Sequence, residues 1–213
     1  MSRARTVRGP LIVAIVLTVG IGMGVAGVLW MRAARPVPGP YVDALAIRDG
    51  VIAIRAEADG PNGFVERWSD GELRWRGLIP TYDGRPGAIG VRVTAGRVAI
   101  RVRRGGQPMS FDLDFARGTK LETGGELTEQ SADAAFPAAT GALPVGYDAP
   151  RHELVSTGGT FYKLPPEAIP PQPYHSDGGV LWIVTPDELT ALSIDTLQPV
   201  MTIPPPPSPT PTR

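Results

Sequence analysis

The stretch from Gly22 to Gly27 reads GMGVAG, which has the glycine spacing of a dinucleotide-binding turn. That turn needs a strand of about six residues before the first glycine and a helix directly after the last one. Here the uncharged run begins at Leu11, too early for such a strand, and Pro36 stops any helix soon after the glycines. We therefore expect no nucleotide and no other cofactor at this stretch.

The chain has two histidines, His152 and His175, and His175 stands two positions before Asp177. On a strand, His175 and Asp177 face the same side and are able to share a metal ion. A catalytic zinc usually has three protein ligands, however, and the remainder would have to come from the distant His152 and Glu153. We interpret these residues as turn or surface positions and predict no metal site.

Two further arrangements suggest catalysis by their residue types. Asp112 and Asp114 share one face of a predicted strand at a Cβ separation of about 7 Å, which suits a carboxylate pair or calcium. Alternating aspartates also keep an exposed strand soluble, and we favour that interpretation. Ser156 lies in STGG, without the G-x-S-x-G turn of a hydrolase. We predict no catalytic residue from these patterns.

The N-terminal apolar run predicts one transmembrane helix over residues 11–31. At about 1.5 Å per residue this helix is about 31 Å long, which matches a hydrocarbon core of about 30 Å. The run exceeds the ~7–15 residues of a cleaved signal peptide, so we expect an uncleaved signal anchor. The flanking arginines favour a cytoplasmic N-terminus and an extracytoplasmic main domain in a single-pass cell-membrane protein; they are Arg3, Arg5 and Arg8 before the run and Arg32 and Arg35 after it.

The glycines of the predicted membrane helix suggest contact with another helix. Gly20, Gly24 and Gly27 fall within about 60° of one helical face, and small residues on one face allow close helix packing. A second copy or an envelope protein would supply the neighbouring helix. Such packing is the one site prediction that the sequence yields.

Charge is distributed unevenly along the 213 residues, although the formal net charge is zero. Residues 1–35 hold five of the 21 Lys and Arg residues and no acid, so the remainder carries an excess of five acidic residues. An acidic domain is unsuited to nucleic acid, whose binding depends on clustered positive charge. The absence of cysteine rules out disulfides, thiol nucleophiles and cysteine-ligated metals.

The composition divides the chain into five segments. Residues 1–10 form a short cytoplasmic tail, 11–31 the anchor, 32–40 a proline-rich linker, 41–203 the extracytoplasmic domain, and 204–213 a disordered proline-rich tail. The last segment reads PPPPSPTPTR, which favours polyproline II conformation. We interpret it as a spacer, and the alternative is a ligand for an aromatic groove of a partner.

Residues 41–203 show a two-residue period that predicts about a dozen strands and no helix. Turn dipeptides separate the strands; we expect a type I′ turn at Asp49-Gly50, and the same device recurs at Asp70-Gly71. We expect Leu73 and Trp75 on one face of a strand, and a loop or irregular insert over 124–150. The predicted core contains aliphatic and tryptophan side chains: Ile52, Ile54, Val98, Ile100, Val102, Trp68, Trp75 and Trp182.

Two segments resemble a known family. SDGELRW (residues 69–75) and LWIVTPDELTALSIDTLQPVMTIP (residues 181–204) are similar to blade segments of quinoprotein-like and YVTN-type β-propellers. The resemblance implies antiparallel sheets of propeller-blade type. Leu197 departs from the family, because a glycine often follows the D-x-x-T element there. A dozen strands make three blades, fewer than the 4–8 of closed propellers, so we expect a partial or atypical propeller, or else a β-sandwich or open barrel.

These patterns favour a binding or scaffold module over an enzyme. The expected protein is a single-pass, membrane-anchored β domain that binds an envelope component, with the lipid bilayer and an envelope protein or a second copy as partners. The alternative is a quinoprotein-like or other envelope enzyme with an unidentified site.

Overall fold

The computed structural model describes residues 36–79, 89–94, 96–104, 107–121 and 142–204. All elements below belong to one compact unit, Val37–Arg213. The predicted membrane helix, its glycine face at Gly20, Gly24 and Gly27, and the tail beyond residue 204 lie outside the described residues. Within the described ranges, no helix has the length and apolar character needed to cross a bilayer.

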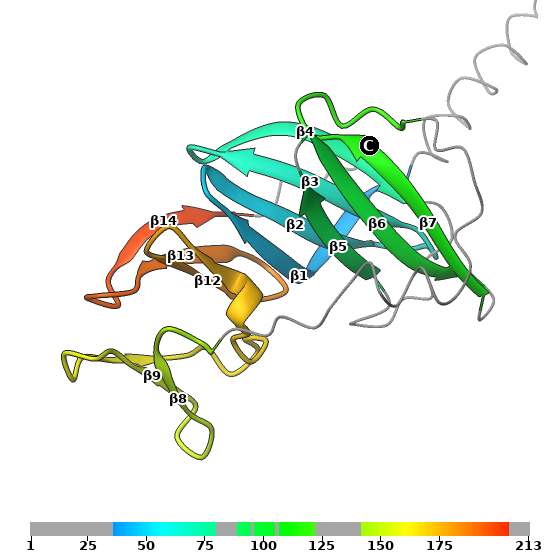
Figure 1. The fold of residues 1–213 in the computed structure, drawn as a ribbon. Helices are drawn as coiled ribbons and strands as arrows, with labels where there is room; N and C mark the ends of the chain where they lie inside the picture. The colour runs from blue at the N-terminus through cyan, green and yellow to red at the C-terminus, as the bar shows by residue number, and fades with distance from the viewer. Residues whose placement is uncertain (1–35, 80–88, 95, 105–106, 122–141, 205–213) are drawn as a thin grey trace, which may run out of the picture. The chain divides into compact units, whose positions relative to one another are not determined.

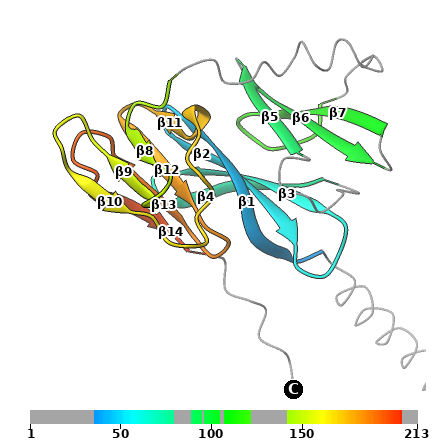
Figure 2. The same ribbon diagram turned by 90° about the horizontal axis from the view of Figure 1, so that it is seen from below.

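The fold is all-β, as predicted, with antiparallel sheets and no closed barrel among the described strands (Figures 1 and 2). Four sheets follow one another along the chain, and in each sheet neighbouring strands are consecutive in sequence. Sheet A contains β1 (Pro38–Ile47), β2 (Gly50–Glu57), β3 (Gly63–Ser69) and β4 (Glu72–Ile79); sheet B contains β5 (Ile89–Thr94), β6 (Arg97–Arg104) and β7 (Gln107–Asp114).

The second half of the chain forms two more sheets. Sheet C contains β8 (Gly146–Asp148), β9 (Glu153–Val155) and β10 (Phe161–Lys163); sheet D contains β11 (Ser176–Asp177), β12 (Val180–Val184), β13 (Leu189–Ser193) and β14 (Pro199–Ile203). A single 3₁₀ turn, η1 (Pro173–His175), precedes β11 among the described elements. The prediction of a loop over 124–150 is wrong at β8, a strand too short to show a two-residue period.

Strand β2 of sheet A and strand β12 of sheet D are buried on both faces, which explains their apolar runs VIAI and LWIV. In β2, Ile52 and Ile54 pack against sheet B, whereas Val51 and Ala53 pack against sheet D. The same division holds in sheet D, whose β12 faces sheet A on one side and sheet C on the other. A strand with two buried faces has no need of polar alternation.

Sheet B buries one face and keeps a polar one, as alternation predicts, whereas the outer face of sheet C is mixed and exposes Phe161. Val98, Ile100 and Val102 of β6 are buried against sheet A, which confirms their predicted place in the core. Arg97 on the same hairpin is exposed and pairs with Asp112 at 3.3 Å. The packing contacts therefore run in the order B, A, D, C, and the predicted core tryptophans Trp68, Trp75 and Trp182 are all buried.

The turns differ from prediction at one place. Asp70 and Gly71 have φ values of 55° and 75°, as a type I′ turn requires. The predicted turn at Asp49-Gly50 is wrong, because Ile47 pairs directly with Gly50 and the turn residues are Arg48 and Asp49. A Cβ atom at Gly50 would lie 2.0 Å from the carbonyl oxygen of Trp68, so this glycine permits close approach of two strands.

An irregular register in sheet A places Leu73 and Trp75 on different faces. Trp68 pairs with Leu73, but the preceding Arg67 pairs with Trp75, so β4 contains an extra residue at this point. Trp75 is therefore buried against sheet B, whereas Leu73 is 39% exposed. The prediction that both lie on one face is wrong because the bulge reverses the alternation.

Candidate functional site

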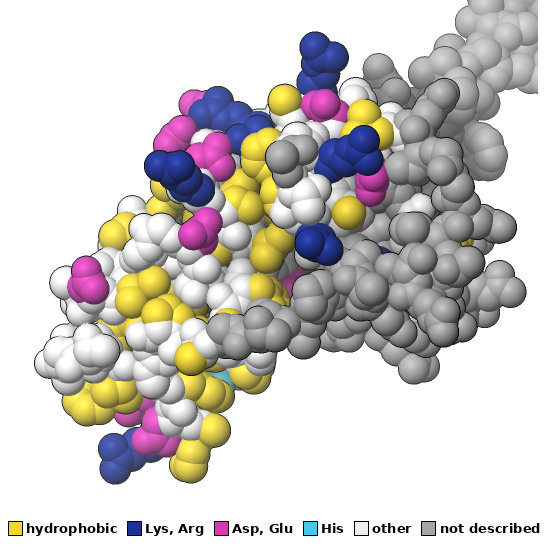
Figure 3. Space-filling view, viewed as in Figure 1, with side chains coloured by type: hydrophobic (Ala, Val, Ile, Leu, Met, Phe, Trp, Pro, Cys, Tyr) yellow, Lys and Arg dark blue, Asp and Glu magenta, His cyan; other side chains and the backbone are white. Residues whose placement is uncertain are grey.

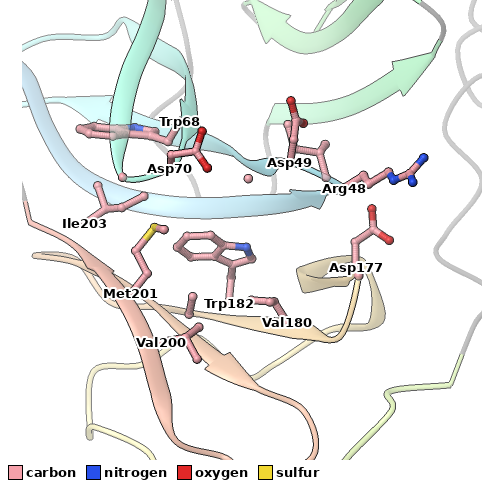
Figure 4. A pocket seen from close by; sticks show the side chains of 15 residues that line it. Arg48, Asp49, Trp68, Asp70, Asp177, Val180, Trp182, Val200, Met201 and Ile203 are labelled. Carbon is pink, nitrogen blue, oxygen red and sulfur yellow. The ribbon is translucent and has the colours of Figure 1, made fainter.

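A cleft of about 250 Å³ lies between sheets A and D. Its walls are largely apolar and include Trp68 of β3, Trp182 of β12, and Val200, Met201 and Ile203 of β14 (Figure 4). Residues of three hairpin turns, at 48–50, 70–71 and 177–178, also line it. Sheets A and D contact each other through β1 on one side and β11 and β12 on the other.

The two cleft tryptophans differ in their hydrogen bonding. The indole N–H of Trp68 donates to Oε2 of Glu66 at 2.9 Å. Trp182 is only 4% exposed, and within the part of the chain that the structure describes its indole N–H has no hydrogen-bond partner. Figure 4 shows this ring across the middle of the cleft, with its nitrogen on the side of Asp177. The cleft therefore combines apolar walls with one unused donor.

Charged side chains surround the cleft at its turns. Asp49 accepts from Arg67 at 2.7 Å, and Asp70 pairs with the exposed Arg74 at 3.3 Å. Arg48 and Asp177 line the same cleft and form no ion pair among the described residues. The rim thus offers charges of both signs, which favours a largely neutral occupant over a strongly charged one.

His175 has a structural role. Its ring is fully buried, its Nδ1 accepts the backbone N–H of Gln172 at 3.1 Å, and its Nε2 lies 3.1 Å from Oδ1 of Asp43. Since Nδ1 accepts, Nε2 carries the proton and donates it to Asp43. The predicted partner Asp177 is exposed, so the structure does not bring these two residues together in a ligand pair.

Asp43 also contacts Tyr174, whose hydroxyl lies 3.5 Å from Oδ2. Burial, and then the negative charge of Asp43, raises the pKa of Tyr174 to about 12. This tyrosine is therefore neutral at physiological pH and acts as a hydrogen-bond donor. Asp43, Tyr174 and His175 together fasten η1 to β1.

His152 is likewise engaged at both ring nitrogens. Its Nδ1 lies 3.0 Å from the hydroxyl of Tyr147, and its Nε2 lies 2.9 Å from the carbonyl oxygen of Pro165. A carbonyl only accepts, so Nε2 carries the proton and Nδ1 accepts from Tyr147. No group of three metal-ligating side chains occurs among the described residues.

The other predicted candidates also have local roles. Asp112 pairs with Arg97, and Asp114 accepts the backbone N–H of Arg117 at 2.8 Å in the turn after β7. Ser156 Oγ accepts the backbone N–H of Thr160 at 3.0 Å and holds the β9–β10 turn. Each hydroxyl or carboxylate thus orders a hairpin, and none faces the cleft.

Sequence reasoning missed a buried charge cluster in sheet A. Glu66 is fully buried and accepts from Arg76 at 2.7 Å, while Arg55 Nη1 lies 3.8 Å from the same carboxylate. Arg55 also donates to the carbonyl oxygen of Gly39 and lies over the ring of Tyr41. Burial lowers the pKa of Arg55, and Glu66 opposes that shift. Because β2 and β3 have two buried faces, alternation gave no signal for these charges.

No family model matches the chain, and no curated protein matches it either. The class of the protein therefore rests on the fold, which is all-β with four antiparallel sheets of consecutive strands. What the protein does must be argued from the cleft and the surface around it.

Proposed function

We propose that the chain is a membrane-anchored binding module whose β domain holds an envelope component in the cleft between sheets A and D. The observation that carries this proposal is the cleft itself, with apolar walls, an unused indole donor and a volume of about 250 Å³. Ligand sites in general are concave and mostly apolar, with a few polar groups that fix orientation. A cleft of this size accommodates a few side chains of a partner.

Exposed apolar residues next to the cleft support the same proposal. Val200 is 58% exposed on β14, an edge strand of sheet D that pairs with no further strand on its outer side among the described residues. On the face shown in Figure 3, hydrophobic side chains are frequent over sheets C and D, and charges of both signs gather over sheet A and at the outer end of sheet C. An exposed apolar edge beside a cleft is typical of a protein interface.

The architecture is consistent with blades of a propeller. Each of the four sheets is a meander of three or four strands, and each packs face to face with its neighbours in the order B, A, D, C. We propose a partial, four-unit propeller, in which the outer faces of sheets B and C leave the ring open. Leu197, where related blades often have glycine, has a φ of 55°, the left-handed conformation that glycine adopts most easily.

The sequence supplies the proposed location. The apolar run over residues 11–31 and its flanking arginines favour a single-pass anchor with the β domain outside the cytoplasm. The face of Gly20, Gly24 and Gly27 would allow that anchor to pack against a neighbouring helix. An anchored domain needs a binding surface that faces away from the bilayer, and the cleft is our candidate.

In-cell photocrosslinking tests the proposed function. A photoreactive residue replaces Val200 in the full-length chain, and the matched control replaces Phe161, which is 61% exposed on β10 and does not line the cleft. We expect a discrete crosslinked product from position 200 and little or none from position 161. If the two positions give the same products, or if neither gives any, the cleft is not a binding site and the proposal fails.

A further inference from the structure

We propose that the occupant of the cleft is the proline-rich segment, residues 204–213, of a second copy of this chain. This inference rests on the proposed function and names the partner of the same site. Three observations carry it: the unused donor of Trp182, the apolar walls of the cleft, and the sequence that follows β14.

The unused donor calls for an acceptor on the occupant. Trp182 is 96% buried. Among the described residues, the side-chain atoms that are fully enclosed and lack a hydrogen bond are Arg55 Nη1, Arg67 Nε and Ser110 Oγ. The indole nitrogen of Trp182 is not one of these atoms, so it is not fully enclosed. The N–H therefore reaches the open space of the cleft, as Figure 4 shows. Because the N–H faces open space, an occupant that covers it must bring an acceptor such as a carbonyl oxygen, or the covered donor would cost free energy.

A proline-rich segment offers the matching chemistry. Each proline has a carbonyl acceptor but no N–H donor, and its ring is apolar. Polyproline II segments are recognised in grooves lined by aromatic side chains. Six of the ten residues from Pro204 to Arg213 are proline, so the segment supplies carbonyls and apolar rings together and brings few donors that the cleft would leave unpaired.

The length of the segment fits the cleft. Residues 205–213 span about 28 Å in polyproline II conformation at about 3.1 Å per residue. The cleft extends along β14 from Val200 to Ile203, which is about 10 Å at 3.3 Å per residue. The segment therefore reaches across the cleft with several residues to spare.

The occupant comes from a second copy because of where the segment begins. Pro204 directly follows β14, and its carbonyl oxygen lies 3.5 Å from the hydroxyl of Tyr41, at the end of β1 opposite the turn at Arg48 and Asp49. To reach Trp182 in its own chain, the segment would have to turn back after the run Pro204–Pro207 and use its few remaining residues to return to the level of Met201. Consecutive prolines are stiff and resist such a reversal.

Disulfide trapping between differently tagged full-length chains tests the inference, because the natural chain has no cysteine. One copy carries Thr210→Cys and the other carries Val200→Cys, with Phe161→Cys as the matched control. We expect the 210–200 disulfide to form at least fivefold faster than the 210–161 disulfide in detergent-solubilised protein. Equal rates, or no disulfide at all, would overturn the inference.

Two further variants separate docking from chance collision. Trp182→Phe removes the donor and should slow the 210–200 reaction about fivefold, as expected for one hydrogen bond, whereas Trp75→Phe should not, since Trp75 packs against sheet B. Replacing Pro206, Pro207 and Pro209 by alanine should slow it as well without touching the folded domain. An unchanged rate in both the Trp182 and the proline variants contradicts docking.

The remaining outcomes separate this inference from the proposed function. If the disulfide forms only within single chains that carry both cysteines, the segment docks on its own domain and the second-copy inference is wrong. If no 210–200 disulfide forms but photocrosslinking from position 200 captures a different protein, the inference fails and the proposed function stands. If both experiments fail, both proposals are abandoned.

Discussion

The Nε2 atom of His175 lies 3.1 Å from Oδ1 of Asp43, a residue 132 positions earlier in the chain. This hydrogen bond joins η1, which leads into sheet D, to β1 of sheet A. Asp43 Oδ1 also accepts the backbone N–H of Ala44 at 2.8 Å. One carboxylate thus helps to hold together the two sheets that form the cleft.

Replacing this carboxylate should destabilise the domain. Asp43→Ala leaves the buried N–H of His175 without an acceptor, and we expect a loss of about 2–3 kcal/mol in the free energy of unfolding. Urea unfolding of the full chain measures it. The matched control, Asp177→Ala, removes an exposed carboxylate and should change stability by less than about 0.5 kcal/mol. Equal losses would show that the His175 contact contributes little.

The buried charge cluster makes a second prediction. Glu66→Ala would leave Arg76 and the indole N–H of Trp68 without their acceptor and the buried Arg55 without its ion-pair partner, and breaking a buried pair from one side costs about 3–5 kcal/mol. Glu72, which pairs with Arg74 on the surface, is the control, and its replacement by alanine should cost no more than about 1 kcal/mol. Thermal unfolding of both variants decides between these values. A small effect of Glu66→Ala would mean that water readily takes the place of the lost carboxylate as the acceptor for these donors.

Leu197 should respond unusually to glycine. It is fully buried but has a φ of 55°, which costs a side-chain-bearing residue about 1–2 kcal/mol. Leu197→Gly should therefore be no less stable than Leu197→Ala, since glycine removes that cost. At Leu192, which is fully buried in β13, alanine should be the more stable by about 0.5–1 kcal/mol. If the alanine variant is more stable than the glycine variant at both positions, the result would argue against left-handed strain at Leu197.

Stability should fall at alkaline pH because of Tyr41. Burial, reinforced by the charge of Glu66, raises the pKa of Tyr41 to about 12 from the ordinary 10.0. The folded state then retains a proton that the unfolded state loses, so its stabilising effect is complete below pH 10 and is lost as pH rises toward 12. This amounts to about 2–3 kcal/mol. Urea midpoints from pH 9 to 12 should fall more steeply in the natural chain than in Tyr41→Phe; parallel curves would contradict this.

Local patterns predicted the hairpins and much of the core. The turn at Asp70-Gly71 and the buried face of β6 follow from turn chemistry and a two-residue period, which act over a few residues. The extra residue in β4 was not predictable, because no local signal marks it, and it reversed the face of Leu73. The turn before β2 was misplaced, since the role of Gly50 depends on Trp68 in another strand.

The candidate site was beyond local prediction. Trp182 was correctly expected in the core, but whether its N–H finds a partner depends on how sheets A and D meet. The same holds for His175, whose acceptor lies in the first strand of the domain. A pattern within ten residues cannot encode contacts between sheets that are more than a hundred residues apart.

Occupancy of the cleft in native membranes is the most direct test of the account. A membrane-impermeant maleimide is applied to full-length chains with a single cysteine at position 200 or 161, in intact membranes and after purification in detergent at high dilution. We predict that Val200→Cys reacts about tenfold more slowly in membranes than when purified, while Phe161→Cys reacts at similar rates in both. Equal reactivity of Val200→Cys in the two preparations would mean that the cleft is empty in the membrane and would contradict a binding module.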